Sequence, residues 1–183
     1  LTVIIIIIVI ILAIWITIKI VKPIIRLSNW AKEVSLGKLS YQDIKLPKNE
    51  VGEMKDRFGD VVNTFKAITE VSKSIAIGDY SKSVEVKSKD DQLGKSVNEM
   101  RETLISVVNH AQKIAIGDFT KSVEVKSEKD QLGNSLKQMR ENLISVVDQA
   151  NTIAKGDYSK EIEPKSEKDE LGVSLSLMKK TLA

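Results

Sequence analysis

The sequence predicts an all-α fold: a transmembrane helix followed by repeated pairs of parallel helices with extended connectors. Three observations predict it. An uncharged apolar run opens the chain, and apolar residues beyond it recur at heptad spacing. A short motif, Asp-Gln/Glu-Leu-Gly, also returns every 39 residues, at 91–94, 130–133 and 169–172. A fixed period of this size indicates one structural unit that is repeated.

The apolar run indicates a membrane span. No charged residue occurs from Leu1 to Ile18, and snorkelling of Lys19 and Lys22 extends the usable span to about Val21. In lipid, a lone segment satisfies its backbone groups only as a helix. A cleaved signal peptide is the alternative, but it requires basic residues before the run, and here they follow it. These basic residues place the C-terminal side in the cytoplasm, so we expect a plasma-membrane protein in contact with lipid.

The repeat predicts long helices that end at glycine. Val107, Ala111 and Ile114 form a 4-3 apolar seam before Gly117, and the seam continues back to the motif Gly94 without a break. One helix is therefore expected from Gly94 to Ile116, with Gly117 as its left-handed stop. Glycines at equivalent places predict the other stops: Gly37, Gly78 and Gly156.

Between each stop and the next motif lies an alternating segment that is too short and solitary to form a sheet. We expect an ordered connector whose apolar residues pack against the helices: Tyr80, Val84 and Val86 in one copy, and Phe119, Val123 and Val125 in the next. Ser127 with Asp130, and Ser166 with Asp169, have capping-box spacing, which predicts that a helix begins at each serine.

The length of the connector predicts how the helices lie. An antiparallel hairpin needs only about two to five residues, whereas a dozen extended residues reach ~40 Å and can return along the helix. The two helices of a copy are therefore expected to be parallel. Two short helices cannot enclose a core, so a parallel homodimer is the expected solution. An antiparallel bundle within one chain is the alternative.

Composition excludes several classes of function. The chain has no cysteine, a single histidine and a net charge of +3, with lysines interspersed among glutamates. We therefore predict no catalytic, cofactor-binding or metal site and no nucleic-acid partner. His110 alone supports no phosphotransfer chemistry.

The order of membrane helix, Pro23, heptad helix, glycine turn, connector, acidic motif and second helix resembles the HAMP domain. The resemblance implies four copies after the transmembrane helix 1–21: copy one at 22–66, copy two at 67–106, copy three at 107–145 and copy four at 146–183. It also implies a parallel dimeric four-helix coiled coil that carries a conformational signal from an upstream sensor to a downstream cytoplasmic output domain. The residues that carry the resemblance are Pro23, Gly37, Glu50, Gly52, Gly78, Asp91, Gly94, Gly117, Asp130, Gly133, Gly156, Asp169, Glu170 and Gly172.

Two departures leave questions open. Gln92 and Gln131 replace the motif glutamate kept at Glu50 and Glu170, so no ionic role is assigned to that side chain. The spacing from motif glycine to the next stop is 26 residues after Gly52 but 23 after Gly94 and Gly133. Either the copies alternate between packing states or the length has drifted harmlessly, since the heptad seam survives both.

Other functions stay open at this stage. The chain is not expected to be an enzyme itself, but it could be part of a sensor histidine kinase or another enzyme whose catalytic domain lies outside it. A purely structural coiled-coil stalk is the third possibility, although continuous heptads would serve a stalk better. Pro23 is either a kink at the membrane edge or part of the connection to copy one.

Overall fold

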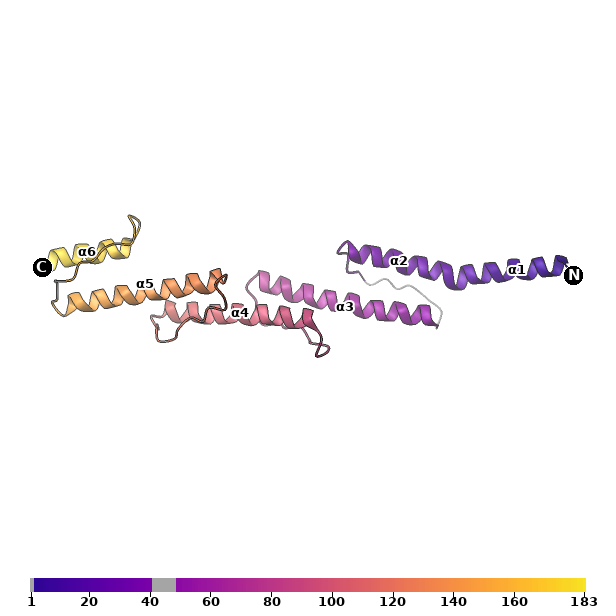
Figure 1. The fold of residues 1–183 in the computed structure, drawn as a ribbon, viewed down its shortest axis with the longest axis horizontal. Helices are drawn as coiled ribbons and strands as arrows, with labels where there is room; N and C mark the ends of the chain where they lie inside the picture. The colour runs from indigo at the N-terminus through magenta and orange to yellow at the C-terminus, as the bar shows by residue number, and fades with distance from the viewer. Residues whose placement is uncertain (1, 41–48) are drawn as a thin grey trace. The chain divides into compact units, whose positions relative to one another are not determined.

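The computed structural model describes residues 2–40 and 49–183. Within these ranges every regular element is helical, which confirms the all-α prediction (Figure 1). The elements are α1 (Thr2–Ile16), a π-helical turn η1 (Thr17–Val21), α2 (Lys22–Ser35), α3 (Glu50–Ala76), α4 (Gln92–Ala115), α5 (Gln131–Ala154) and α6 (Glu170–Leu182).

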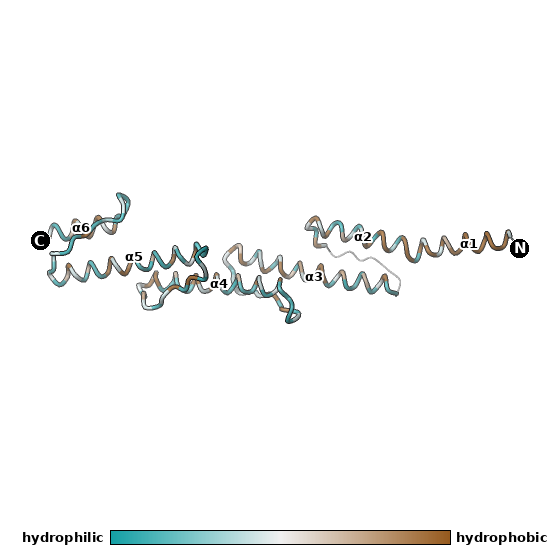
Figure 2. Tube along the Cα trace, in the orientation of Figure 1, coloured by the Kyte–Doolittle hydropathy of each residue, from teal (hydrophilic) through white to brown (hydrophobic). Residues whose placement is uncertain are grey.

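The N-terminal helix is long and apolar enough to cross a membrane. It continues from Thr2 to Ser35 through α1, η1 and α2. Figure 2 shows α1 as hydrophobic along its length, and no residue of α1 is buried within the chain. Its apolar side chains therefore have no protein core to enter, which fits a lipid environment.

Pro23 does not break this helix. It lies in the first turn of α2, directly after η1, where the Lys22 N–H donates to the Thr17 carbonyl. A proline lacks an N–H and its ring clashes with the carbonyl four residues earlier. The wider turn before it is a recognised way for a helix to accommodate that clash.

The chain forms two compact units, residues 1–101 and 102–183. Each contains small apolar clusters built from a first helix, a connector or loop, and a second helix. In the first unit, Leu27 and Trp30 pack with Val62, and Val71 and Val84 pack with Val97. In the second unit the cluster is Ile153, Ile162 and Leu175.

The two helices of a copy lie parallel. In copy two, the Lys87 Nζ donates to Thr64 Oγ1 over 2.6 Å, so the connector has returned along α3 before α4 begins. Val97 packs against Val71, and four residues further on the Arg101 Nε donates to the Tyr80 carbonyl beyond the end of α3. Moving forward along α4 therefore means moving forward along α3. This confirms the parallel arrangement within a copy and excludes the antiparallel hairpin there.

Helix lengths follow the spacing of the motifs. The α3 helix has 27 residues, whereas α4 and α5 have 24 each, so the extra three residues at the first junction are helical. On α3, Met54, Val61 and Phe65 are exposed in the single chain, while Val62 is fully buried. Each chain thus covers only part of its own apolar surface.

The connector residues also differ in burial. Val84 is buried, as expected, but Val86 is 41% exposed and the prediction that it packs against the helices was wrong. Of the two valines, only Val84 belongs to the apolar cluster that Val71 on α3 and Val97 on α4 form.

Candidate functional site

Each first helix ends in the same glycine turn. Gly37, Gly78, Gly117 and Gly156 have φ between 78° and 81°. Each glycine N–H bonds to the carbonyl three residues back at 2.9–3.0 Å, and the next N–H bonds to the carbonyl five residues back at 2.9–3.2 Å. This pair of bonds is the Schellman motif, whose left-handed residue is easily adopted only by glycine. The structure confirms all four predicted stops.

The motif aspartates join each connector to the second helix. In copy two, Asp91 Oδ1 accepts from the Gly94 N–H at 2.9 Å, and Asp91 Oδ2 accepts from the Lys87 N–H at 3.0 Å. Asp130 makes the same pair of bonds with Gly133 at 2.9 Å and Lys126 at 3.1 Å. Asp169 repeats them with Gly172 at 3.0 Å and Lys165 at 2.9 Å. We call this two-sided contact the aspartate clasp.

The clasp corrects the predicted helix starts. The expected caps were Ser127 and Ser166, but α5 and α6 begin after Asp130 and Asp169, which act as the N-caps. The Asp130 N–H instead donates to the Ser127 carbonyl at 3.0 Å, which closes a turn before the helix. A cap must lie within three residues of the free N–H that it satisfies, and only the aspartate meets this condition at Gly133.

The clasp also explains the motif glycine. A Cβ on Gly94 would lie 2.6 Å from Asp91 Oδ2, and added Cβ atoms on Gly133 and Gly172 would collide with the matching oxygens of Asp130 and Asp169. These oxygens are held by the clasp and cannot withdraw without breaking it. Glycine is therefore needed here for space, whereas at the helix stops it is needed for its backbone conformation.

In copy one an asparagine takes the capping place of the clasp aspartate. Asn49 caps α3, and its Oδ1 accepts from the Val51 N–H at 3.2 Å and the Gly52 N–H at 3.4 Å. The connector residues 41–48 lie outside the described ranges. Glu50 and Glu170 are the first residues of α3 and α6 and are exposed. Gln92 and Gln131 occupy the same place in α4 and α5, so glutamine is tolerated where the side chain faces solvent.

Hydrogen bonds stabilise the charged form of the clasp aspartates. The Gly94 N–H, followed by the Lys87 N–H, lowers the pKa of Asp91, and the corresponding bonds lower the pKa of Asp130 and Asp169. The aspartates after the glycine stops behave similarly. The side chains and N–H groups of Ser81, Thr120 and Ser159 lower the pKa values of Asp79, Asp118 and Asp157.

The sequence reasoning missed three kinds of contact to the connectors, made by lysine, arginine and asparagine side chains. Lys87 and Lys126 donate from Nζ to Thr64 and Thr103 at 2.6 Å, and Lys165 contacts Asn142 in the same way. The Arg101 Nε donates to the Tyr80 carbonyl at 2.6 Å, and the Arg140 Nε donates to the Phe119 carbonyl at 2.9 Å. In copy two, and not in copies three and four, an asparagine, Asn98, binds both the N–H and the carbonyl of the buried connector valine, Val84, at 2.9 and 2.8 Å. The 39-residue recurrence of the lysines and of the two arginines was the available signal.

The arrangement is suited to mechanical coupling. The end of the first helix, the connector and the start of the second helix are tied together by bonds to the backbone, so the connector links the two helices of a copy. Within residues 2–40 and 49–183, no group of three or more histidine, aspartate or glutamate side chains could hold a metal ion.

The HAMP domain family matches residues 143–173 of this chain. The matched segment runs from the second half of α5, through the Gly156 turn and the connector, to the Asp169 clasp and the start of α6. No curated protein and no solved structure matches the chain.

Proposed function

We propose that this chain transmits signals across a membrane through an array of four HAMP copies, from an upstream sensor to a downstream cytoplasmic output domain. HAMP domains occur in transmembrane signal transducers, which makes signalling the natural role for the matched segment. The observation that carries the proposal is the recurrence, outside that segment, of the same glycine turn and aspartate clasp.

Copy three repeats the turn, the clasp and the core positions of the matched segment. The Gly156 turn and Asp169 clasp of the matched segment have counterparts 39 residues earlier at Gly117 and Asp130. The core positions correspond as well. Ile153 and Leu175 match Ile114 and Leu136, and all four are buried. Residues 78–116 and 117–155 are identical at 25 of 39 positions, so we infer the same fold for copies two and three.

A parallel homodimer is part of the proposal because each copy leaves apolar side chains uncovered. Met100, Met139 and Met178, at matching places in the second helices, are 45%, 41% and 50% exposed. Leu93, Leu132 and Leu171 at the helix starts are 45%, 49% and 53% exposed. A second chain in parallel register would bury these rows and complete four helices at each level.

We also propose that the chain resides in the plasma membrane, which the apolar N-terminal helix supports. The helix from Thr2 to Ser35 would span the bilayer with its apolar N-terminal part, and the basic residues that follow would hold the copies in the cytoplasm. Catalysis, where it occurs, would belong to an output module outside this chain.

A chimera tests the proposal. The chain would be placed in frame between a ligand-binding extracytoplasmic domain and a cytoplasmic cyclase, with cyclase activity in membranes as the readout. We expect ligand to change cyclase activity. A matched chimera would replace residues 67–183 with a continuous heptad coiled coil of the same helical phase.

The outcomes separate relay from stalk. If ligand changes cyclase activity in the native chimera but not in the coiled-coil chimera, the interrupted architecture is required for relay. Equal ligand responses from both chimeras would assign the array the role of a stalk. A cyclase that is active but indifferent to ligand in the native chimera would contradict the proposed function.

A further inference from the structure

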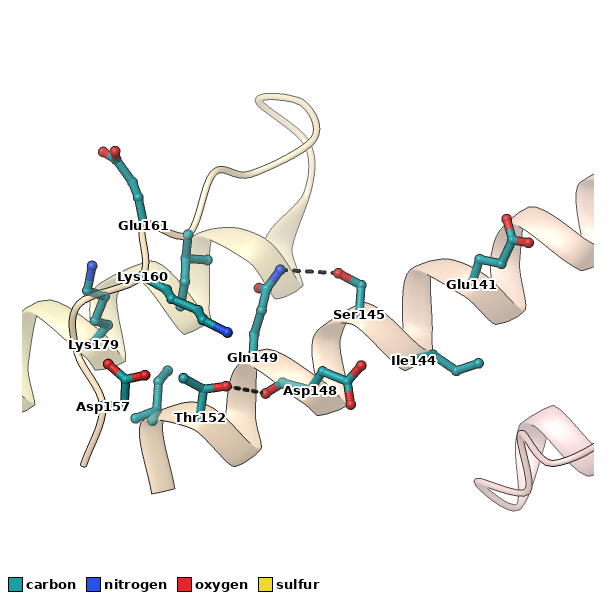
Figure 3. A pocket seen from close by; sticks show the side chains of 12 residues that line it. Glu141, Ile144, Ser145, Asp148, Gln149, Thr152, Asp157, Lys160, Glu161 and Lys179 are labelled. Carbon is teal, nitrogen blue, oxygen red and sulfur yellow. Dashed lines mark hydrogen bonds between the residues drawn. The ribbon is translucent and has the colours of Figure 1, made fainter. Parts of the chain in front are cut away.

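The only histidine of the chain occupies a position that the other copies fill differently. His110 lies seven residues before the Gly117 stop, and the matching residues before Gly37, Gly78 and Gly156 are Trp30, Val71 and Gln149. Trp30 and Val71 are buried in the apolar clusters of their copies. Gln149 donates to the Ser145 Oγ of its own helix at 3.2 Å (Figure 3).

His110 instead bridges α4 and the connector of copy three. Its Nδ1 lies 2.8 Å from the Ser106 carbonyl oxygen, one helical turn earlier, and its Nε2 lies 3.1 Å from the Ser122 carbonyl oxygen. A carbonyl oxygen only accepts hydrogen bonds. A neutral imidazole carries one N–H, so it can donate to one of these two oxygens but not to both. Only the protonated ring satisfies both bonds.

The connector of copy three has weaker apolar packing than the connectors of copies two and four, so the His110 contact matters more to it. Its core residue Val123 is half-buried, whereas the matching Val84 and Ile162 are 5% and 7% exposed. Apolar burial therefore contributes less to holding this connector against its helices. The contact between His110 and Ser122 lies next to Val123 and compensates for the weaker packing.

No charged neighbour takes the place of either carbonyl. The charged residues that line the space around the ring are Glu102 and Lys113 on α4, Lys121, Glu124 and Lys126 on the connector, and Asp130 at the start of α5. Lys126 is engaged with Thr103, and Asp130 is engaged in its clasp. The described bonds of the ring go to the Ser106 and Ser122 carbonyls.

We propose that His110 is a proton-operated latch on the connector of copy three. The protonated ring ties the Ser122 carbonyl to α4 by a charge-assisted bond, and loss of the proton either breaks that bond or leaves a weaker neutral one. The latch is therefore closed when the ring carries its second proton and is opened or weakened when that proton is lost. The latch does not rest on the proposed signalling role. If the array relays signals, the packing of copy three would respond to pH.

The experiment uses the 183-residue chain in lipid nanodiscs. Hydrogen-exchange protection of the copy-three connector, 118–126, is compared with that of the copy-two connector, 79–87, in the same sample at pH 5.5 and pH 8. We expect the ratio of protection to fall about fivefold as the pH rises, because a charge-assisted bond to Ser122 is lost or weakened. Histidine-selective ¹⁵N labelling gives one pair of ring signals, and the fall should track the titration of that ring.

Two variants take their replacements from the other copies. His110→Gln introduces the residue of copy four, and His110→Val introduces that of copy two. Both should abolish the pH dependence of the ratio, with the copy-two connector unchanged as evidence of folding. A ratio that does not change with pH in the natural chain would overturn the proposal. A pH dependence that persists in His110→Gln would overturn it as well, since another group would then be responsible.

Discussion

Copies two and four share one backbone frame but anchor their connectors differently. Both have the glycine turn, at Gly78 and Gly156, and both have the aspartate clasp, at Asp91 and Asp169. In copy two, Asn98 and Arg101 add three bonds to the connector backbone. Copy four has Ser176 and Lys179 at these positions, and the bonds described for 146–183 include none from either side chain to the connector.

This difference separates two groups of residues that have different roles. Residues with strict local requirements, namely the turn glycine and the clasp aspartate, set the frame and recur in each of copies two to four. Residues that reach across from the second helix set how firmly the connector is held, and they vary. Among copies two to four, the connector therefore has the least side-chain support in copy four. If helices shift during signalling, copy four should yield first.

Acid should weaken the aspartate clasps of copies two, three and four together. The folded state lowers the pKa of Asp91, Asp130 and Asp169, so their contribution is complete above the unfolded value of about 4 and is lost as the pH falls through the lower folded value. The amide NMR signals of Lys87, Lys126 and Lys165 should shift together below about pH 4. Asp91→Asn should remove this shift at Lys87 alone. Independent transitions in the three copies would show that the clasps are not equivalent.

Removal of Asn98 should loosen copy two and leave copy four unchanged. Asn98→Ala leaves the N–H and carbonyl of Val84 without their partners in a partly buried place, so the opening free energy of that connector should fall by about 2 to 3 kcal/mol. Hydrogen exchange of residues 79–87 measures this. Lys137→Ala, at the matching place in copy three, is the control and should have little effect. Equal losses from both variants would contradict a specific role for Asn98.

Substitution of the turn glycine should affect both copies equally. An added Cβ on Gly78 or Gly156 meets no atom within 4 Å, so Gly78→Ala and Gly156→Ala cost only the strain of a positive φ, about 1 to 2 kcal/mol each. Thermal unfolding of the 183-residue chain in nanodiscs, with hydrogen exchange to locate the effect, checks this. A loss confined to one copy would mean that the frame is not shared.

Transfer of the arginine should strengthen copy four. Lys179→Arg supplies the fork that Arg140 directs at the Phe119 carbonyl, so the connector 157–165 should gain about 0.5 to 1 kcal/mol of protection. Arg140→Lys should weaken the connector 118–126 by a similar amount. Hydrogen exchange of both connectors in the two variants is the measurement. If neither connector responds, the arginine contact does not hold the connector.

Most features that local interactions set were predicted from the sequence, whereas features that depend on contacts between distant residues were not. The stop at Gly117 and the continuous helix up to it were predicted correctly, because left-handed glycine and heptad spacing are local signals. The helix start was wrong because serine and aspartate are both capping residues, and the spacing did not show which one reaches the free N–H. Asn98 was not predicted because its bond reaches a connector residue 14 positions away and the matching residues, Lys137 and Ser176, differ. Arg101 was not predicted although it recurs as Arg140, because the recurrence does not show which backbone group the side chain reaches.

Cysteine cross-linking in membranes tests the parallel dimeric array most directly. The chain has no cysteine, so Met100→Cys and Met139→Cys introduce single thiols on the uncovered apolar rows of copies two and three. Glu102→Cys and Glu141→Cys, two residues further along and exposed, are the matched controls. The account predicts rapid disulfide-linked dimers from both methionine positions and slow ones from both glutamate positions. Absence of dimers at Met100 and Met139, or equal rates at all four positions, would contradict it.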